Sequence, residues 1–443
     1  MGEGSKRRRI SSTKDKAGKA ETKPKHSSWS WSWSDLPDQL LGLILGKLSL
    51  ADIIHCCAVC SSWRSTAQSH CTQSTSTTPW LMLPGDEKYD STTRCFFNLA
   101  ENKVYKMKNA FEGFGKDAWC VGSSHGWLVI LDDEAIPHLF NPFSRVRIQL
   151  PSIPNEFLSP NIDRDYFVQY LRKIFIAKAV LLADPSRSNN FGVVVICGSL
   201  SRLAFCKKGD TTWTELAVRS LSTYQQYVEY SDIICHDNQV YVLASDASVE
   251  VWDFRSSFPT KIMSIDKPST LQKVVGNSFF IHNLSPKFYL VKTSTDFLFI
   301  KRFIGDFVNA EGLVVDEDYV LYNSEICPYR TKLFYVYRLN FRQNTWEQVE
   351  SLNDQVVFLG GNQSISLSSH DLLECIPDSI YFTDDRWDEM DVDDSYGGHD
   401  IGFFNLDDQS IKPYYHLNLA RIDPPSFWIT PNLSMVKDKD DVS

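Results

Sequence analysis

Two short patterns in this chain of 443 residues contain side chains that could do chemistry. Residues 122–126, Gly-Ser-Ser-His-Gly, fit the G-x-S-x-G pattern, in which the serine of a hydrolase (here Ser124) occupies a tight turn between a strand and a helix. Residues 127–131, however, are Trp-Leu-Val-Ile-Leu and favour a strand. The helix and the oxyanion hole that depends on it are missing, so we interpret the pattern as a hairpin turn. An esterase that uses Ser124 is the alternative.

The second pattern is a group of cysteines and histidines. Cys57 and Cys60 form a C-x-x-C pair, and His55 and His70 lie nearby in the sequence. A structural zinc ion needs four such ligands that converge as a tetrahedron. These cysteines instead share a predicted helix face with Ile53, where free cysteine behaves as a small buried hydrophobic residue. We therefore favour core packing over a metal site.

Other chemical signatures are absent from the sequence. It contains no phosphate-binding loop, no dinucleotide-binding glycine motif after a strand and no His-Glu-x-x-His pair. Residues 132–134 are three adjacent acids, but paired acid–base catalysis needs two carboxyl groups that face one cleft. The sequence thus predicts no catalytic residue, no cofactor and no metal, and the chain is not expected to be an enzyme.

The elements that would position these residues differ along the chain. Residues 34–70 have the clearest helical pattern, because Pro37 suits a first turn and apolar residues recur after it at helical spacing. Ser49 can cap a second helix, and Ser-Ser at residues 61–62 precedes a third. Three such short helices bury little surface alone, so we expect this unit to pack on a neighbour or a partner.

From residue 76 to residue 430, short β-rich runs alternate with turn residues. Residues 127–131 and 239–243 are examples, and tryptophan recurs after small polar residues at Trp213 and Trp346. At roughly 40–50 residues per blade, this length predicts seven or eight blades of a β-propeller. A stack of β-sandwiches is the alternative. The predicted fold class is α+β and multidomain, with a small three-helix unit before a large all-β domain.

Charge is distributed unevenly along the chain. The net charge is −10, yet residues 1–28, which we expect to be a disordered tail, hold nine Lys or Arg against three acids. Residues 384–394 hold seven acids and one Arg, a density that predicts an exposed loop. With residues 431–443 as a charged C-terminal tail, the predicted domains are residues 29–75 and residues 76–430.

The sequence also limits where the protein can be located and what it can bind. No apolar stretch of signal-peptide or membrane-spanning length is present, and the eleven cysteines are typical of reduced thiols. We therefore expect a protein of the nucleus and/or cytoplasm that has no membrane partner. Lys-Arg-Arg-Arg at residues 6–9 matches a nuclear import signal, although a solvated arm without a receptor fits equally well. The acidic balance argues against nucleic acid as the partner.

Residues 36–64 resemble an F-box. The family pattern opens on Leu-Pro, continues as an apolar ladder, places an Asp at the start of the second helix and closes on Val-Cys-x-x-Trp-Arg. Each element is present at the expected spacing, from Leu36 and Pro37 through Asp52 to residues 59–64.

The large domain resembles the plant family catalogued as domain of unknown function 295, whose members are also called KIB or F-box/kelch-like. The resemblance rests on residues 123–128 (SSHGWL), 140–143 (FNPF), 356–366 (VVFLGGNQSIS) and 378–384 (DSIYFTD), in this order after an F-box. Kelch repeats would carry a Gly-Gly doublet in each blade, whereas this sequence contains two doublets in all.

These resemblances imply a substrate-recognition subunit of an SCF-type (Skp–cullin–F-box) E3 ubiquitin ligase that does no chemistry itself. The F-box would dock the Skp adaptor, and through it a cullin, while the propeller would bind an unknown target protein for ubiquitination. The residues that the resemblance assigns to the F-box fold and its adaptor-binding face are Leu36, Pro37, Leu40, Ile44, Leu48, Val59 and Trp63. The alternative is a propeller scaffold that binds proteins without a cullin complex.

Overall fold

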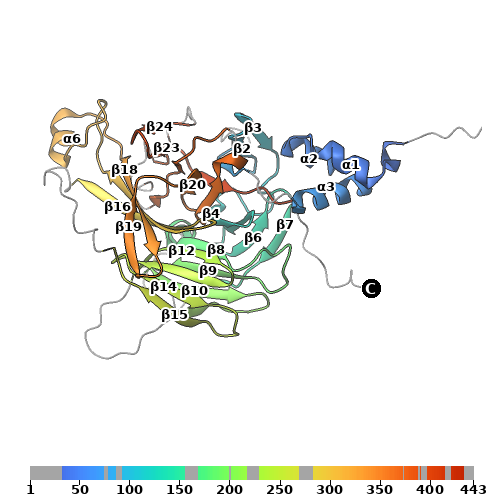
Figure 1. Ribbon diagram of the computed structural model, residues 1–443, viewed down its shortest axis with the longest axis horizontal. Coiled ribbons are helices and arrows are strands. Elements are labelled where there is room, and N and C mark those ends of the chain that lie inside the picture. The colour runs from blue at the N-terminus through green and yellow to red at the C-terminus, as the bar shows by residue number, and fades with distance from the viewer. Residues whose placement is uncertain are drawn as a thin grey trace, which may run out of the picture.

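The computed structural model describes most of the chain. The described residues are 32–73, 78–85, 92–154, 168–198, 201–216, 229–268, 283–372, 374–387, 390, 397–414 and 421–433. A small helical unit lies beside a large β domain, and the two are linked by a short connection (Figure 1). The two predicted tails lie outside the described residues, except that residues 431–433 are described.

The helical unit contains the three predicted helices. They are α1 (Asp38–Leu45), α2 (Leu50–Cys56) and α3 (Ser61–Gln73), preceded by a 3-10 turn at Trp33–Asp35. Helix α2 begins as predicted, because the Ser49 hydroxyl accepts a hydrogen bond from the backbone N–H of Asp52 at 3.2 Å. Gly46, Lys47 and the residues up to Ser49 form the turn between α1 and α2.

The strands form a β-propeller whose described residues make six sheets (Figure 1). Blade one contains β1 (Trp80–Leu83), β2 (Arg94–Asn98), β3 (Lys103–Met107) and β25 (Phe427–Ile429). Blade two contains β4 (Trp119–Ser124), β5 (Trp127–Leu131), β6 (Pro137–Asn141) and β7 (Val146–Gln149). Blade three contains β8 (Ile176–Leu181), β9 (Gly192–Cys197), β10 (Arg202–Lys207) and β11 (Thr214–Leu216).

Blades four to six follow in chain order. Blade four contains β12 (Tyr230–His236), β13 (Gln239–Ala244), β14 (Val249–Asp253) and β15 (Thr260–Ile265). Blade five contains β16 (Leu284–Lys292), β17 (Phe297–Gly305), β18 (Arg330–Asn340) and β19 (Thr345–Val349). Blade six contains β20 (Gln355–Leu359), β21 (Ile365–Ser368), β22 (Ser379–Phe382), β23 (Gly402–Asn405) and β24 (Ile411–Lys412). In blade six, β20 and β22 are parallel, and the other paired strands are antiparallel.

The α+β propeller fold is confirmed, but the predicted number of seven or eight blades is wrong. The prediction divided the length by a typical blade, and several connections in this chain are much longer than a typical turn. The connection between β17 and β18 contains helix α6 (Glu317–Asn323), and a π-helix (Leu171–Phe175) precedes β8. Residues in such connections lengthen each blade and lower the number of blades.

The predicted strands and turns are observed where the sequence signal was strongest. Strand β5 has the predicted bounds, and His125 and Gly126, which join it to β4, both have positive φ angles. Asp237 and Asn238 join β12 and β13 in the same way. Two consecutive residues with positive φ form the turn that suits the twist of a β-hairpin, so these pairs fix the register of their strands.

The two recurring tryptophans have equivalent roles in blades three and five. The indole N–H of Trp213 donates to the backbone oxygen of Pro151 at 2.8 Å, and that of Trp346 donates to the backbone oxygen of Asp266 at 2.9 Å. Each tryptophan lies at or beside the outermost strand of its blade, and each acceptor lies in the connection that enters that blade. The repeated motif therefore ties the outer strand of a blade to its incoming chain.

The ends of the propeller chain meet in blade one. Strand β25 pairs antiparallel with β1, with Trp80 opposite Ile429 and Met82 opposite Phe427. The innermost strands β25, β4, β8, β12, β16 and β21 contact one another in that order from blade one to blade six. A C-terminal strand thus closes a sheet that begins near the N-terminus, which prevents the ring from opening at its seam.

Gln363 crosses the centre of this ring. Its amide Nε2 donates to the backbone oxygen of Cys235 at 3.2 Å, and its Oε1 accepts from the hydroxyl of Ser124 at 3.2 Å. Its backbone N–H also donates to the backbone oxygen of Ser123 at 2.9 Å. One side chain on the connection between β20 and β21 therefore links blades two, four and six.

We expect Gln363→Ala to lower the free energy of unfolding by about 1–3 kcal/mol, because it removes the partners of polar groups near the centre of the ring. Urea denaturation would measure the change. Gln348→Ala, at an exposed position of β19, is the matched control and should change the free energy of unfolding by less than about 0.5 kcal/mol. Equal effects of the two substitutions would contradict the central role of Gln363.

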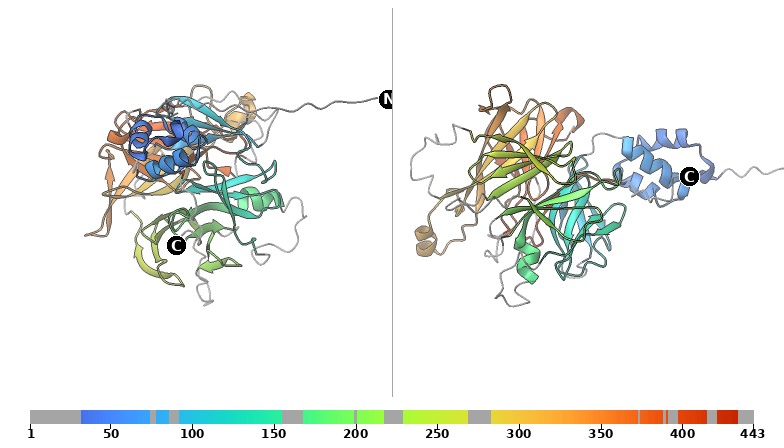
Figure 2. Two further views of the ribbon diagram at one scale, coloured as in Figure 1. Left: turned by 90° about the vertical axis from the view of Figure 1, so that its right-hand side faces the viewer. Right: turned by 90° about the horizontal axis from the view of Figure 1, so that it is seen from below.

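The helical unit packs on blade one and on the C-terminal segment. Leu50 and Ile54 of α2 are half-buried against the propeller core, and Leu433 packs into the helical core with Leu41 and Leu45. Figure 2 shows the helical unit beside the first blades of the propeller. Leu433 is 5% exposed. The packed part of the chain therefore runs past residue 430, where the sequence suggested that a charged tail begins.

Candidate functional site

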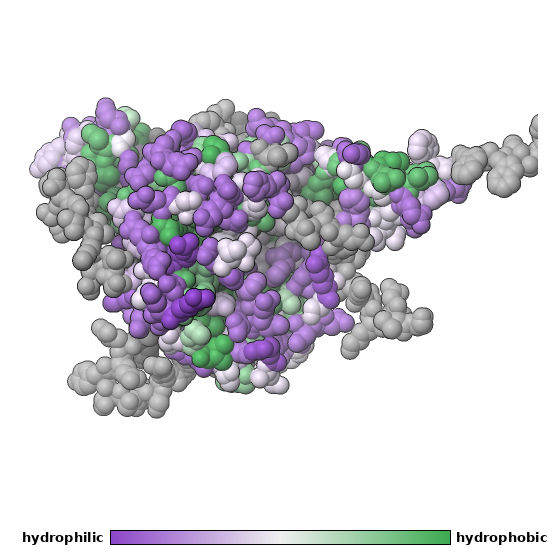
Figure 3. All heavy atoms as spheres, in the orientation of Figure 1, coloured by the Kyte–Doolittle hydropathy of each residue, from purple (hydrophilic) through white to green (hydrophobic). Residues whose placement is uncertain are grey.

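Helix α1 has one apolar face in the helical core and a second that is exposed. Leu41 and Leu45 are completely buried, whereas Leu40, Leu43 and Ile44 are 51%, 71% and 38% exposed. Figure 3 shows hydrophobic side chains gathered on the helical unit. Exposed apolar groups of this density on so small a unit are typical of a surface that a partner covers.

The structure divides the seven residues predicted for the F-box into two groups. Pro37, Leu40, Ile44 and Val59 are exposed, whereas Leu36, Leu48 and Trp63 are half-buried against the helical core. The second group supports the fold of the unit rather than its surface.

Trp63 shows how this support works. Its indole N–H donates to the backbone oxygen of Trp33 at 2.9 Å, and nearby the Thr66 hydroxyl donates to the carboxylate of Asp38 at 2.9 Å. The first bond joins α3 to the 3-10 turn before α1, and the second joins α3 to the first residue of α1, so together they fix the helix that carries the exposed leucines. Sequence reasoning missed Leu43, although its spacing from Leu40 was an available signal. The alternating Trp-Ser run at residues 29–34 predicted a linker whose indoles pack on the following helices, but Trp33 is 72% exposed.

The propeller face away from the helices is the second candidate surface. At the other face, the side-chain amide of Asn432 donates to the backbone oxygen of His125 at 3.0 Å, directly before Leu433 enters the helical core. His125 follows the end of β4, whereas Trp119 begins it. Groups around Trp119 therefore lie at the end of the blades opposite the helical unit.

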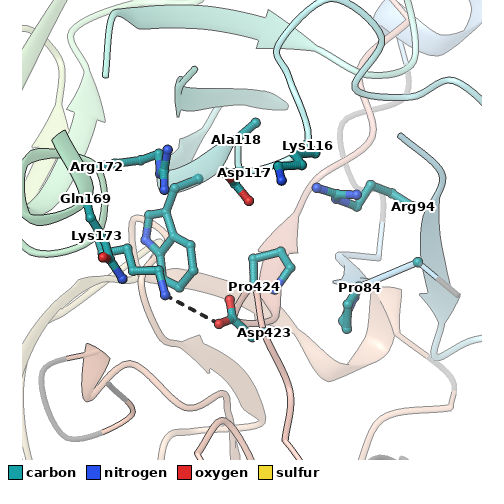
Figure 4. Close-up of a pocket in the computed structure, with 12 residues that line it drawn as sticks. Pro84, Arg94, Lys116, Asp117, Ala118, Gln169, Arg172, Lys173, Asp423 and Pro424 are labelled. Carbon is teal, nitrogen blue, oxygen red and sulfur yellow. Dashed lines mark hydrogen bonds and ion pairs between the residues drawn. The ribbon is translucent and has the colours of Figure 1, made fainter. Parts of the chain in front are cut away.

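A cavity of about 550 Å³ opens at this opposite end, between blades one and two and the π-helix before β8. Figure 4 shows the basic side chains of Arg94, Lys116, Arg172 and Lys173 around it. Two carboxylates also line it, and that of Asp423 lies 3.5 Å from the ammonium group of Lys173. We call this space the basic cavity.

A buried ionic network joins blades five and six. Arg302 of β17 is 1% exposed, and its guanidinium lies 2.8 Å from the carboxylate of Asp400 and 3.3 Å from that of Asp385. It also donates to the hydroxyl of Thr331 at 2.6 Å and to that of Tyr289 at 3.1 Å. Asp385 lies shortly after β22 and Asp400 lies shortly before β23, so both carboxylates belong to blade six. Arg302 of blade five therefore holds two blades together.

The expectation of an exposed loop at residues 384–394 is wrong for the residues that the structure describes. Asp384 and Asp385 are 1% and 8% exposed, and Trp387 and Met390 are also buried. Residues 388–389 and 391–394 lie outside the described part of the chain. The acids can be buried because basic groups from a distant part of the sequence compensate them. Lys287, for example, lies 3.2 Å from Asp385.

Two neighbouring carboxyl groups in this region, those of Asp384 and Asp385, have opposite pKa shifts. Burial, together with the neighbouring carboxylate of Asp400, raises the pKa of Asp384 to about 6. Burial would also raise the pKa of Asp385, but Lys287 and Arg302 outweigh it and hold that pKa below its ordinary value. The folded protein therefore binds a proton at Asp384 more readily than the unfolded chain does.

This difference predicts a pH dependence of stability. Because the folded pKa of Asp384 is raised, its contribution to stability grows as the pH falls through about 6 toward the ordinary value of 3.8. Asp384→Asn removes the titration. The unfolding free energy of the unsubstituted protein should therefore rise relative to that of the variant, by about 1 kcal/mol between pH of about 7 and about 5. Urea denaturation of both proteins at both pH values would measure their unfolding free energies. If the difference between these free energies did not change with pH, the raised pKa of Asp384 would be contradicted.

The structure does not place the G-x-S-x-G pattern or the group of cysteines and histidines in the surroundings that their possible chemistry needs. Ser124 ends β4 in a hairpin, and its hydroxyl lies 3.2 Å from the Gln363 amide oxygen. Cys56 is buried in the helical core, where burial raises its pKa, and Cys57 is half-buried. Within the described residues, no three His, Cys, Asp or Glu side chains are placed to hold a metal ion. No described helix has both the length and the apolar character that a membrane crossing requires.

The helical unit followed by a propeller defines the class of F-box proteins with a β-propeller domain. The F-box domain model matches residues 33–73, and the KIB1-4 beta-propeller model matches residues 96–405, which is more than half of the chain. The protein therefore belongs to the KIB1-4 beta-propeller family.

Relatives of similar length come from Arabidopsis thaliana. The chain is 25% identical to the F-box/kelch-repeat protein KIB1 over 396 residues, which cover 88% of this chain and 85% of that protein. It is 22% identical to F-box protein At2g05970, over 93% of this chain and 98% of that protein. Among solved structures, the N-terminal domain of Nup159 matches with 11% identity and a TM-score of 0.29, covering 60% of each chain.

Proposed function

We propose that this protein is the substrate-recognition subunit of an SCF-type E3 ubiquitin ligase, located in the nucleus and/or the cytoplasm. The observation that carries the proposal is the exposed apolar surface of α1, formed by Leu40, Leu43 and Ile44 in a domain that the F-box model matches. Burial of such a surface against helices of the Skp adaptor would remove it from water, and this favours association.

In this proposal the protein has no catalytic role. The F-box binds the Skp adaptor, and through it a cullin, while the propeller binds a target protein. Holding the target in this assembly raises the effective concentration of its lysines near a charged conjugating enzyme. The separation supports this division of roles, because the basic cavity opens at the end of the blades opposite the helical unit.

Co-purification from plant cells tests the proposal. The unsubstituted chain should bring down the Skp adaptor and a cullin, and the double variant Leu36→Ala, Pro37→Ala should lose both. Undiminished capture by the double variant would contradict the assignment. If the unsubstituted chain captured neither protein while residues 76–430 still bound a partner, the protein would instead be a scaffold that acts without a cullin complex.

A further inference from the structure

Strand β15 is the outermost strand of blade four, and its outer edge has no strand partner among the described residues. Its inner edge pairs with β14, and the strand lies at the periphery of the propeller (Figure 1). An edge strand offers a row of backbone N–H and C=O groups with which another strand can pair. With six residues, β15 is about 20 Å long and can support such pairing.

The other outer strands of the described sheets are protected in ways that β15 lacks. Strands β11 and β24 have three and two residues, and the exposed positions of β3, β7 and β19 carry polar or charged side chains. These side chains are Lys103 and Lys106 in β3, Arg147 and Gln149 in β7, and Thr345, Glu347 and Gln348 in β19. Short length and charge are two features that prevent a sheet edge from pairing with another chain.

Large apolar side chains, in contrast, are exposed on β15 and just before it. Phe258, Ile262 and Met263 are 62%, 48% and 47% exposed. The pairing of β14 with β15 shifts between Val251 and Trp252, so Ile262 is an extra residue in β15. Such a bulge re-aims the side chains around it, and here two consecutive apolar side chains are exposed. The edge therefore presents apolar groups that a partner would remove from water.

The charges around β15 are balanced. Lys261 in the strand pairs with Glu250 of β14, and Arg255 before the strand pairs with Asp253. Residues 254–265 contain no acid. A net charge of −10 makes two copies of this chain repel one another in general, whereas at this nearly neutral edge they can approach.

The strand is also complementary to itself. In an antiparallel pair of two β15 strands, the two-fold axis passes through the middle of Thr260–Ile265, between Ile262 and Met263. Each Ile262 then lies opposite the second copy's Met263. Each Lys261 lies opposite the second copy's Ser264, so no like charges face one another. The exposed apolar groups thus meet at the centre of the contact.

We propose that two copies of this protein form a symmetric dimer through their β15 edges. Blade four is three blades from blade one in either direction around the ring of six sheets, and the helical unit packs on blade one. The dimer would therefore hold both helical units away from the contact, where each remains free to bind a partner. The contact does not depend on the proposed ligase role. If that role holds, one assembly would carry two adaptors and bind a multivalent target more tightly.

Analytical ultracentrifugation of the full-length chain from about 1 µM to about 100 µM tests the dimer, because so short a contact predicts weak association in this range. The mass should rise from that of one chain, 50.7 kDa, toward twice that value. Ile262→Lys, Met263→Lys should weaken the association at least about tenfold, since like charges from the two copies would meet. Thr345→Lys, Gln348→Lys adds the same charge at exposed positions of β19 and should leave the association unchanged.

Amide hydrogen exchange locates the contact. The backbone amides of residues 260–265 should exchange more slowly at about 100 µM than at about 1 µM, while those of β19 should not change. Circular dichroism verifies that both lysine variants stay folded. Three results would each overturn the dimer: the mass of one chain at every concentration, association undiminished in Ile262→Lys, Met263→Lys, or slower exchange at another surface with none in β15. The last result would assign the association to that other surface.

Discussion

Replacing Leu40 and Ile44 together by aspartate is expected to lower the affinity for the Skp adaptor at least about a hundredfold, because two apolar groups of the proposed adaptor-binding surface would become charges that binding must bury. Both side chains are exposed in the free protein, at 51% and 38%, so the substitutions should leave the fold intact. Isothermal titration with the purified adaptor would measure the affinity, and circular dichroism would confirm that the helices and strands persist.

A matched control is available at the other end of the molecule. Leu321 and Tyr322 of α6 are 71% and 86% exposed, and Leu321→Asp, Tyr322→Asp adds the same charge to an exposed helix far from the F-box (Figure 1). This variant should bind the adaptor as the unsubstituted protein does. Equal losses in both double variants would indicate a general effect of negative charge, and no loss in either would exclude the exposed face of α1 as the adaptor-binding surface.

Replacing Arg302 by methionine should lower the free energy of unfolding by about 3–5 kcal/mol, because Asp385 and Asp400 would lose the cation that compensates their buried charges. Methionine preserves much of the length and apolar volume of the side chain, so the effect reports the loss of charge and hydrogen bonds rather than a cavity. Urea denaturation followed by intrinsic fluorescence would measure the change.

Arg338→Met is the control for this substitution. The Arg338 side chain is 39% exposed, and its guanidinium lies 4.0 Å from the carboxylate of Asp296. Ion pairs at such exposure contribute about 0–1 kcal/mol, so the control should change stability little. A loss of less than about 1 kcal/mol in Arg302→Met would show that the network between blades five and six tolerates unpaired carboxylates.

The local features of the fold could be predicted because they depend on local sequence. Strand β5 and the turn at Asp237 and Asn238 follow from alternation of strand-forming runs with residues that accept positive φ. The number of blades could not be predicted, because it depends on connections such as the one containing α6, whose length has no fixed relation to the strands they join.

The candidate site could be predicted only in part, because it depends on tertiary packing and on contacts between residues distant in the sequence. The apolar ladder of α1 identified the helix but not which leucines face inward, since Leu40 and Leu41 have the same chemistry and differ only in what packs against them. The burial of Asp384 and Asp385 depends on Arg302 and Lys287, which lie in a different blade. The density of acidic residues in a short segment does not reveal that basic residues distant in the sequence will compensate them.

The position of Leu433 has a consequence for how the protein is made. Strand β25 and Leu433 follow all the other described strands in chain order, whereas β1 and the helices that they complete precede those strands. Because a chain is synthesised from its N-terminal side, these helices lack Leu433 until the blades between them and this residue have been made. A product that stops before β25 would lack both the ring seam and Leu433. Synthesis of this one segment therefore completes both modules.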